Sequence, residues 1–412
     1  MAFLESYLQQ MRQDFPTAWQ GSDLSSLLNP NLVSSQVLGI KRSSLEKIAA
    51  FVASIYKLRS VPEYQKYILN SHSLFATPGF VHPKNHSVLM SFDFHLVNDE
   101  DPKLIEINTN ASSSLIIHES YRMQKRENIF AVNATSFEKE ILSCFENEYL
   151  LWAESRADQS QKLRTIAIVD ENPPAQKLYI EFLLYQDVFL RAGYNCIITD
   201  PKELAIKNGR LVYQENLEID LVYNRHTDFY FSTAACEALK EAYVKSYACF
   251  TPHPLEYALL ADKNRLFEFS NSPKLLAMIS AEEQALIQSV VLRSFDVKSY
   301  ADKDWFWANK KTLFFKPKRS YGGKASYRGQ GVTQTVFANI LSQDYLAQEF
   351  APPSEVEVTL EDGSKASFKY DLRFYVYNGR IQLGLARLWR GQMTNISSLG
   401  GGLAPIYIRP LG

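Results

Sequence analysis

The chain is poor in cysteine and carries almost no net charge. Four cysteines occur in 412 residues. They are widely spaced and form no CxxC pair: Cys144, Cys196, Cys236 and Cys249. This excludes a dense disulfide framework and favours free thiols in a reducing compartment. The 44 basic residues balance 45 acidic ones, for a net charge of −1, so we expect neither nucleic acid nor an anionic membrane as a partner.

Long apolar runs and the common nucleotide-binding signatures are also missing. No stretch approaches the roughly 20 apolar residues that cross a bilayer. The N-terminal residues 1–15 lack a basic leader followed by an apolar run, so they read as an amphipathic helix and we expect a cytoplasmic protein. Neither a P-loop nor a GxGxxG pattern is present, so a Walker or Rossmann site is not supported.

A chain of 412 residues is too long for one compact core. Its predicted secondary structure also changes along the sequence. Residues 1–160 are mainly helical but contain a β-hairpin at 88–110. Residues 161–250 alternate strands and a helix, which predicts a partly parallel α/β unit. Residues 251–412 begin as helix and continue as strands with glycine-rich connections. The overall class is therefore mixed, α+β or α/β.

The hairpin at 88–110 carries an acidic face. Alternation places five apolar residues on the other face, which should be core: Val88, Met90, Phe92, Phe94 and Leu96. A turn centred between Asp99 and Glu100 places Asp93 opposite Glu106, with Asn108 one diagonal step away. Opposed carboxylates repel, and a divalent cation removes the repulsion. The oxygen donors of Asp93, Glu106 and Asn108 suit Mg²⁺; a solvated hairpin face is the alternative.

A glycine-rich segment follows an apolar strand that ends in lysines. In FFKPKRSYGGKASYRGQGV, Lys316 and Lys318 supply charge, while Gly322 and Gly323 let backbone N–H groups approach a phosphate. A surface hairpin rich in lysine and glycine would look the same. Lys263, in ADKNR, is a further candidate for a phosphate contact, although such a lysine is often simply solvated.

The strand YLAQEF ends in a polar pair, and a nucleotide base needs a backbone donor and acceptor at a strand edge. Gln348, Glu349 and Phe350 can provide them.

The C-terminal strands contain two arginines whose planar forks suit phosphate or carboxylate, Arg373 and Arg387. Asn378-Gly379 predicts a two-residue hairpin between their strands. Asn395 and the glycines Gly400 and Gly401 can position a phosphate or a substrate amide. The alternative is a charged sheet face with a flexible tail.

Taken in order, these segments resemble an ATP-grasp domain. The string Asp371, Arg373, Arg387, Thr394-Asn395 and Gly400-Gly401 is similar to that of ribosomal-protein glutamate ligases, whose metal ligands come next as an Asp and a Glu-x-Asn. Here the chain ends first, but Asp93, Glu106 and Asn108 have that form near the N-terminus.

The segment IEINT also resembles the metal-binding strand of eukaryotic glutathione synthetases, which are circularly permuted. Those enzymes carry an acidic metal ligand within the glycine-rich loop, where this chain has Ser320. The resemblance implies a circularly permuted ATP-grasp fold in which 88–110 folds against 370–404 and 161–250 is an inserted α/β substrate-side or lid-side domain. Arg225, in VYNR, then faces the cleft or is a surface arginine.

The same resemblance implies an activity. ATP and Mg²⁺ would activate a small-molecule or peptide carboxylate as an acylphosphate, which an amine then attacks to form an amide. Arg373, Arg387 and Asn395 would act on the transferring group, and Lys263, Lys316 and Lys318 on ATP. An ATP-grasp kinase or phosphotransferase, or a non-catalytic nucleotide-binding module, are the alternatives.

Overall fold

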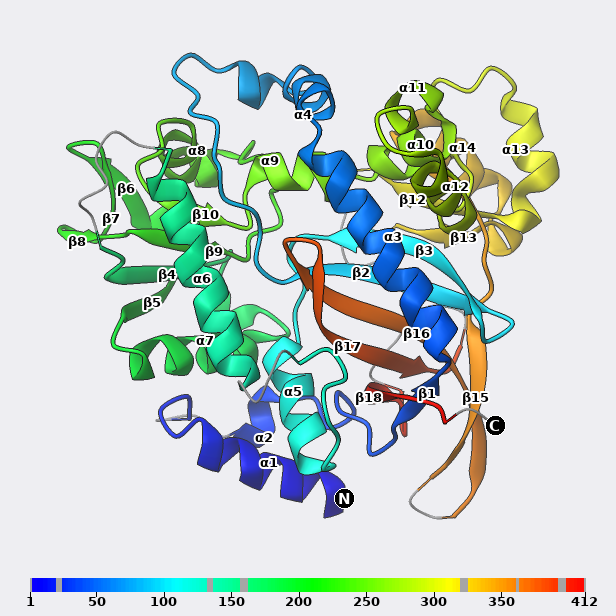
Figure 1. Ribbon diagram of the computed structural model, residues 1–412, viewed down its shortest axis with the longest axis horizontal. Helices are drawn as coiled ribbons and strands as arrows, with labels where there is room; N and C mark the ends of the chain where they lie inside the picture. Colours follow the sequence, from blue (N-terminus) through cyan, green and yellow to red (C-terminus); the bar gives the residue numbers. More distant parts are fainter. Residues whose placement is uncertain are drawn as a thin grey trace.

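The largest sheet combines strands from both ends of the chain (Figure 1). The computed structural model describes residues 2–19, 24–131, 136–155, 162–318, 325–360, 363–391 and 398–410. Across the sheet the strands are β1 (Leu38–Ile40), β18 (Gly402–Ile408), β17 (Arg380–Trp389), β16 (Lys365–Tyr377), β2 (Met90–Val97) and β3 (Asp101–Asn108), with β15 (Ser354–Thr359) also paired to β16. β1 and β18 are parallel and the other pairs antiparallel. The pairing of β2 with β16 confirms that 88–110 folds against 370–404.

The hairpin of β2 and β3 has the predicted register at its centre. All five residues of the predicted apolar face are buried, and Asp93 pairs with Glu106. The turn itself differs, because Val97 pairs with Asp101, and the register shifts between Asp93 and Phe94. The extra residue is a β-bulge in β3. Leu104 therefore joins the buried face in place of Ile105, which was expected there.

The hairpin of β16 and β17 turns at Asn378 and Gly379, as predicted. Their φ angles of 45° and 77° match the left-handed pair of a type I′ turn, which Asn-Gly adopts readily. The turn brings Asp371 directly opposite Arg387.

The N-terminal region is largely helical, in agreement with the sequence. Its helices are α1 (Ala2–Asp14), α2 (Leu24–Leu27), α3 (Arg42–Ser60), α4 (Pro62–Leu69), α5 (Ser114–Met123) and α6 (Phe137–Ala153). α3 packs on the apolar face of β2, where the Phe51 ring meets the Phe92 and Phe94 rings edge-on. These contacts leave the opposite face of β2 for polar side chains.

The middle region contains a parallel sheet, as predicted. Its order is β10 (Cys249–Thr251), β9 (Leu221–Asn224), β4 (Thr165–Val169) and β5 (Asn195–Thr199). The region also holds α7 (Tyr179–Arg191) and α8 (Glu237–Val244). Strands β6 (Leu204–Lys207), β7 (Arg210–Tyr213) and β8 (Leu217–Glu218) form a separate antiparallel sheet, so the segment GRLVY lies outside the parallel one.

A third unit has its own apolar core, built around Phe295, Phe306, Phe315 and Tyr345. Its sheet order is β11 (Ser294–Asp296), β14 (Tyr345–Glu349), β12 (Leu313–Pro317) and β13 (Tyr327–Arg328). The helices of 251–342 are α9 (Pro254–Glu256), α10 (Asn264–Asn271), α11 (Pro273–Leu276), α12 (Ala281–Val290), α13 (Lys303–Asn309) and α14 (Gln334–Ser342). This small sheet meets the large one beside β3, where Lys316 of β12 donates to the Ile105 carbonyl.

Short helical turns complete the described chain. They are the 3-10 segments Ser73–Ala76, Pro173–Ala175, Pro201–Glu203, Ala234–Cys236, Lys310–Thr312 and Gly329–Gly331, and the π segment Tyr257–Ala261. Among the described helices, none is both long and apolar enough to cross a bilayer. All four cysteines are buried and free, as the sequence indicates.

Candidate active site

A row of charged side chains crosses the polar face of the large sheet. Glu106 on β3 is opposite Asp93 on β2, and Asp93 is opposite Arg373 on β16. Arg387 on β17 is opposite Asp371 on β16. The side chains of cross-strand neighbours lie about 5 Å apart. Strand pairing alone therefore brings together the predicted site residues of these four strands.

Asp93 is bound by the arginines rather than left open for a metal. Its Oδ1 accepts from Arg373 Nε at 2.8 Å. Its Oδ2 accepts from Arg373 Nη2 at 2.7 Å and from Arg387 Nη2 at 2.9 Å. Burial acts to raise the pKa of Asp93, but the charges of Arg373 and Arg387 outweigh it and hold the pKa below its usual value. The repulsion between Asp93 and Glu106 that suggested a cation is therefore relieved, at Asp93, by two guanidinium groups.

Glu106 and Asn108 remain suitable for Mg²⁺. Asn108 Nδ2 donates to Glu106 Oε1 at 3.2 Å. Within the described part of the chain, no hydrogen bond engages Glu106 Oε2 or Asn108 Oδ1, and both side chains are partly exposed. One carboxylate and one amide oxygen fit a cation that keeps its other positions for water and phosphate. The described residues contain no cluster of three or more His, Cys, Asp or Glu side chains that could hold a metal.

Two lysines reach the same place from outside the large sheet. Lys316 Nζ, on β12, donates to the Ile105 carbonyl at 2.8 Å and to Gln348 Oε1 at 2.9 Å. Burial lowers the pKa of Lys316 to about 8, although Glu106 opposes the shift. Burial likewise lowers the pKa of Lys263, next to α10, again against the charge of Glu106. The β-bulge at Ile105 thus presents a carbonyl that holds the Lys316 ammonium group beside Glu106.

Other predicted phosphate ligands are placed differently. Lys318 Nζ forms ion pairs with Asp296 and Asp344, each at 3.0 Å. This lysine therefore binds within its own small sheet, and its predicted role toward ATP receives no support. Gly322, Gly323 and Asn395 lie outside the described residues.

The expected base-binding edge at 348–350 is not an edge. β14 is paired on both sides, with β11 and with β12. The Glu349 N–H donates to the Arg293 carbonyl and the Phe350 N–H to that of Thr312, both at 2.8 Å. These two backbone donors are therefore unavailable to a base. Gln348 instead holds Lys316, and its Nε2 is buried without a partner among the described residues.

Arg225 is a buried arginine, not a surface one. It is 7% exposed, and its Nη1 donates to the Ala111 carbonyl at 2.9 Å, just beyond Asn108. Sequence reasoning missed its neighbour Asp170, whose pKa burial raises to about 6 while Arg225 opposes the shift. Asp170 follows β4 and Arg225 follows β9, and the carboxyl ends of parallel strands are a common ligand position. The signal for Asp170 was its place at the end of the strand RTIAIVD.

Close packing limits the room for a larger side chain at Gly400 and Gly401. A Cβ on Gly401 would lie 2.4 Å from the Leu388 carbonyl oxygen, and one on Gly400 would lie 2.5 Å from Leu360 Cδ2. Close packing on β17 therefore accounts for Gly401 without a substrate.

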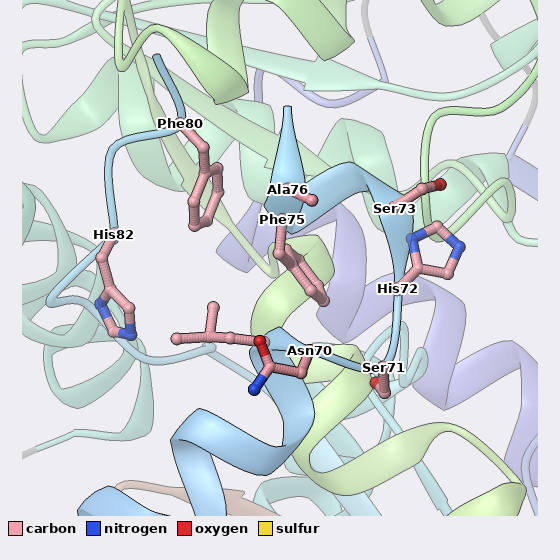
Figure 2. A pocket seen from close by; sticks show the side chains of 9 residues that line it. Asn70, Ser71, His72, Ser73, Phe75, Ala76, Phe80 and His82 are labelled. Atoms are coloured by element: carbon pink, nitrogen blue, oxygen red, sulfur yellow. The ribbon is translucent and has the colours of Figure 1, made fainter. Parts of the chain in front are cut away.

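A separate cavity of about 360 Å³ opens between α4 and the loop that follows it (Figure 2). Its lining includes Asn70, His72, Phe75, Phe80 and His82. No acidic residue and none of the predicted site residues line it, so it is distinct from the charged row.

Comparisons with known proteins bear on the fold. No protein-family model matches the chain, and no curated protein sequence is significantly similar to it. A glutathione synthetase-like effector from Globodera pallida, solved in its apo form, covers 99% of this chain and 97% of its own, with a TM-score of 0.59 and 11% identity. The fold is glutathione synthetase-like. At this identity the likeness extends to the fold alone.

Two further solved structures show weaker similarity. A protein from Methylobacillus flagellatus, provisionally described as a gamma-glutamylcysteine synthetase, covers 87% of this chain and 86% of its own, with a TM-score of 0.44 and 11% identity. The ATP-grasp ligase PsnB, solved with minimal precursor, Mg and ADP, covers 59% of this chain and 88% of its own, with a TM-score of 0.26 and 13% identity. Both scores are too low to support a structural argument.

Proposed function

We propose that the chain is an ATP-dependent carboxylate–amine ligase with a circularly permuted ATP-grasp fold. One observation carries this proposal: Lys316 crosses from the small sheet to the Ile105 carbonyl of the large sheet, beside Glu106 and Asn108. A buried ammonium next to a pair of metal-type oxygen donors fits the triphosphate of Mg-ATP. The glutathione synthetase-like fold supports the same class of chemistry.

Each group has a role that its geometry permits. Mg²⁺, when bound, would neutralise charge on the phosphate oxygens. Glu106 and Asn108 would hold it, and Lys263 and Lys316 would bind the phosphates. The Nη1 groups of Arg373 and Arg387 have no hydrogen-bond partner among the described residues, so they are available to the transferring phosphoryl group.

The proposed reaction has two steps. A substrate carboxylate oxygen attacks the γ-phosphorus, the bond from that phosphorus to the β–γ bridging oxygen breaks, and ADP leaves. An amine then attacks the carbonyl carbon of the acylphosphate, phosphate leaves, and the amine nitrogen loses a proton. Positioning supplies most of the rate in such a transfer. The substrate would lie between the arginine pair and the end of β9, where Arg225 and Asp170 offer charges of both signs.

A matched pair of hairpin variants tests the proposal. Glu106→Gln should abolish ATP turnover and leave the thermal midpoint nearly unchanged, because the only hydrogen bond of the Glu106 side chain among the described residues is with Asn108. Glu100→Gln, an exposed change in the same hairpin that removes only an ion pair with Lys41, should leave turnover intact. ADP release measured across amino acids and dipeptides decides the matter: near-normal turnover in Glu106→Gln would refute the metal assignment.

A further inference from the structure

Asp93 is a fully buried carboxylate whose two oxygens already accept three hydrogen bonds from arginine. Charge-assisted bonds of 2.7 to 2.9 Å are among the strong ones that proteins make. A metal ion at Asp93 would compete with the two guanidinium groups for the carboxylate and would face their positive charge. Arginine thus occupies three of the roughly four lone-pair positions of Asp93.

Both guanidinium groups are held through the same edge, the one formed by Nε and Nη2. Arg373 uses Nε and Nη2 on Asp93. Arg387 uses Nε and Nη2 on Asp371, at 2.7 and 2.9 Å, and its Nη2 also reaches Asp93. Asp93 Oδ2 is thus the one atom that both guanidinium groups share.

The opposite edge of each fork is left for a ligand. Nη1 of Arg373 and Nη1 of Arg387 have no hydrogen-bond partner in the described ranges, and the two side chains are 13% and 16% exposed. Two carboxylates balance two guanidinium groups, so the cluster is neutral until an anion arrives. An arginine fixed along one edge loses little freedom when the other edge binds.

We propose that Asp93 is a positioning residue: it holds Arg373 and Arg387 side by side as one cradle for the transferring phosphoryl group, and it does not bind the metal. This inference rests on the proposed function. The protein ligands of the metal are then Glu106 and Asn108 alone. Asp93→Asn tests this, because an amide keeps one acceptor oxygen and replaces the other with an N–H₂ group, whose two donors oppose a guanidinium group.

The test separates metal binding from turnover. Mn²⁺ in the presence of ADP is titrated by electron paramagnetic resonance, and ATP turnover is measured on the same proteins. Asp93→Asn should keep its Mn²⁺ affinity, whereas Glu106→Gln should lose about tenfold or more. In turnover, Asp93→Asn should lower kcat about 100-fold with little change in KM for ATP, because misplaced arginines act on the transition state.

Two controls guard against a general loss of structure. Asp99→Asn removes another arginine-bound carboxylate of the same hairpin, one that binds Arg409 away from the site, and should preserve kcat in the folded protein. The double variant Asp93→Asn, Arg387→Gln removes one charge of each sign, so the pocket stays neutral. It should retain Mn²⁺ affinity even where the single variant folds poorly.

The outcomes are distinguishable. A loss of Mn²⁺ affinity in Asp93→Asn as large as that in Glu106→Gln would make Asp93 a ligand and overturn this inference, as would an unchanged kcat. A wild-type protein that binds no Mn²⁺ with ADP would overturn the proposed function and this inference with it.

Discussion

Nucleotide binding should weaken as the pH rises from 7 to 9, because Lys316 loses its proton in that window. Its pKa in the ligand-free protein is about 8. The protonated fraction then falls from about nine-tenths at pH 7 to about one-tenth at pH 9. If the ammonium is the form that binds phosphate, the Kd for Mg-ADP should rise about tenfold, which is about 1.4 kcal/mol.

The lowered pKa of Lys316 also affects the stability of the folded protein. The pKa is lowered from 10.5 to about 8, so the charged lysine destabilises the folded state by about 3 kcal/mol at every pH below 8. Between pH 8 and 10.5 the unfolded chain binds more protons than the folded one. The ligand-free wild type should therefore gain stability across that window relative to Lys316→Met.

Calorimetric titration of Mg-ADP at pH 7, 8 and 9 tests the binding prediction. The control is Lys316→Arg, because a guanidinium group stays charged at all three values. Burial lowers the pKa of Lys263 too, so the informative quantity is the difference between wild type and Lys316→Arg. Equal pH slopes in the two proteins would refute the role of Lys316.

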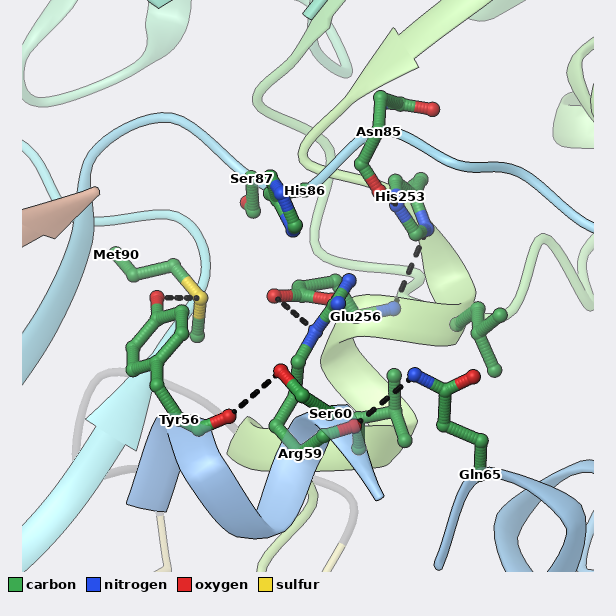
Figure 3. Close-up of polar contacts among 12 residues, drawn as sticks. Tyr56, Arg59, Ser60, Gln65, Asn85, His86, Ser87, Met90, His253 and Glu256 are labelled. Atoms are coloured by element: carbon green, nitrogen blue, oxygen red, sulfur yellow. Dashed lines mark hydrogen bonds and ion pairs between the residues drawn. The ribbon is translucent and has the colours of Figure 1, made fainter. Parts of the chain in front are cut away.

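The remaining predictions concern stability. Arg59→Met should lower the free energy of unfolding by about 3–5 kcal/mol, because it strands the Glu256 carboxylate, which has no exposed surface and accepts from Arg59 at 2.7 to 3.2 Å (Figure 3). Urea unfolding measures this, and adding Glu256→Gln should recover much of the loss; a loss below about 1 kcal/mol would contradict the reasoning. Gly401→Ala should lower the thermal midpoint through its 2.4 Å approach to the Leu388 carbonyl, whereas Gly331→Ala, with nothing within 4 Å of its added Cβ, should not. Unchanged midpoints in both would remove the packing explanation.

Local patterns in the sequence predicted the two hairpins. Five apolar residues at every second position determined which face of β2 is buried, and Asn378-Gly379 determined the turn between β16 and β17. The pairing of Asp93 with Glu106 was also predicted, although the predicted turn was wrong. The observed turn shifts the register by one residue, and the bulge at Ile105 shifts it back. Bulges depend on pairing and packing across strands, so alternation did not reveal this one.

The partners of the charged residues were less predictable. Asp93 and Arg373 lie 280 positions apart, and nothing in either segment indicates that the arginines would satisfy the carboxylate in place of a cation. The segment YLAQEF predicts a strand but not its position between two others, which occupies the backbone donors of Glu349 and Phe350. Both the arginine pairing and the strand position depend on long-range contacts, on which a local pattern carries no information.

Trapping with hydroxylamine tests the central claim most directly, because hydroxylamine captures an activated carboxylate as a hydroxamate. The purified protein is incubated with Mg-ATP, hydroxylamine and a panel of amino acids and dipeptides, and products are identified by mass spectrometry. The ligase assignment predicts a hydroxamate that forms only with ATP, in step with ADP release, and that Glu106→Gln fails to make. ADP release with a phosphorylated product and no hydroxamate would contradict it in favour of a kinase, and failure to bind Mg-ATP would leave a non-catalytic fold.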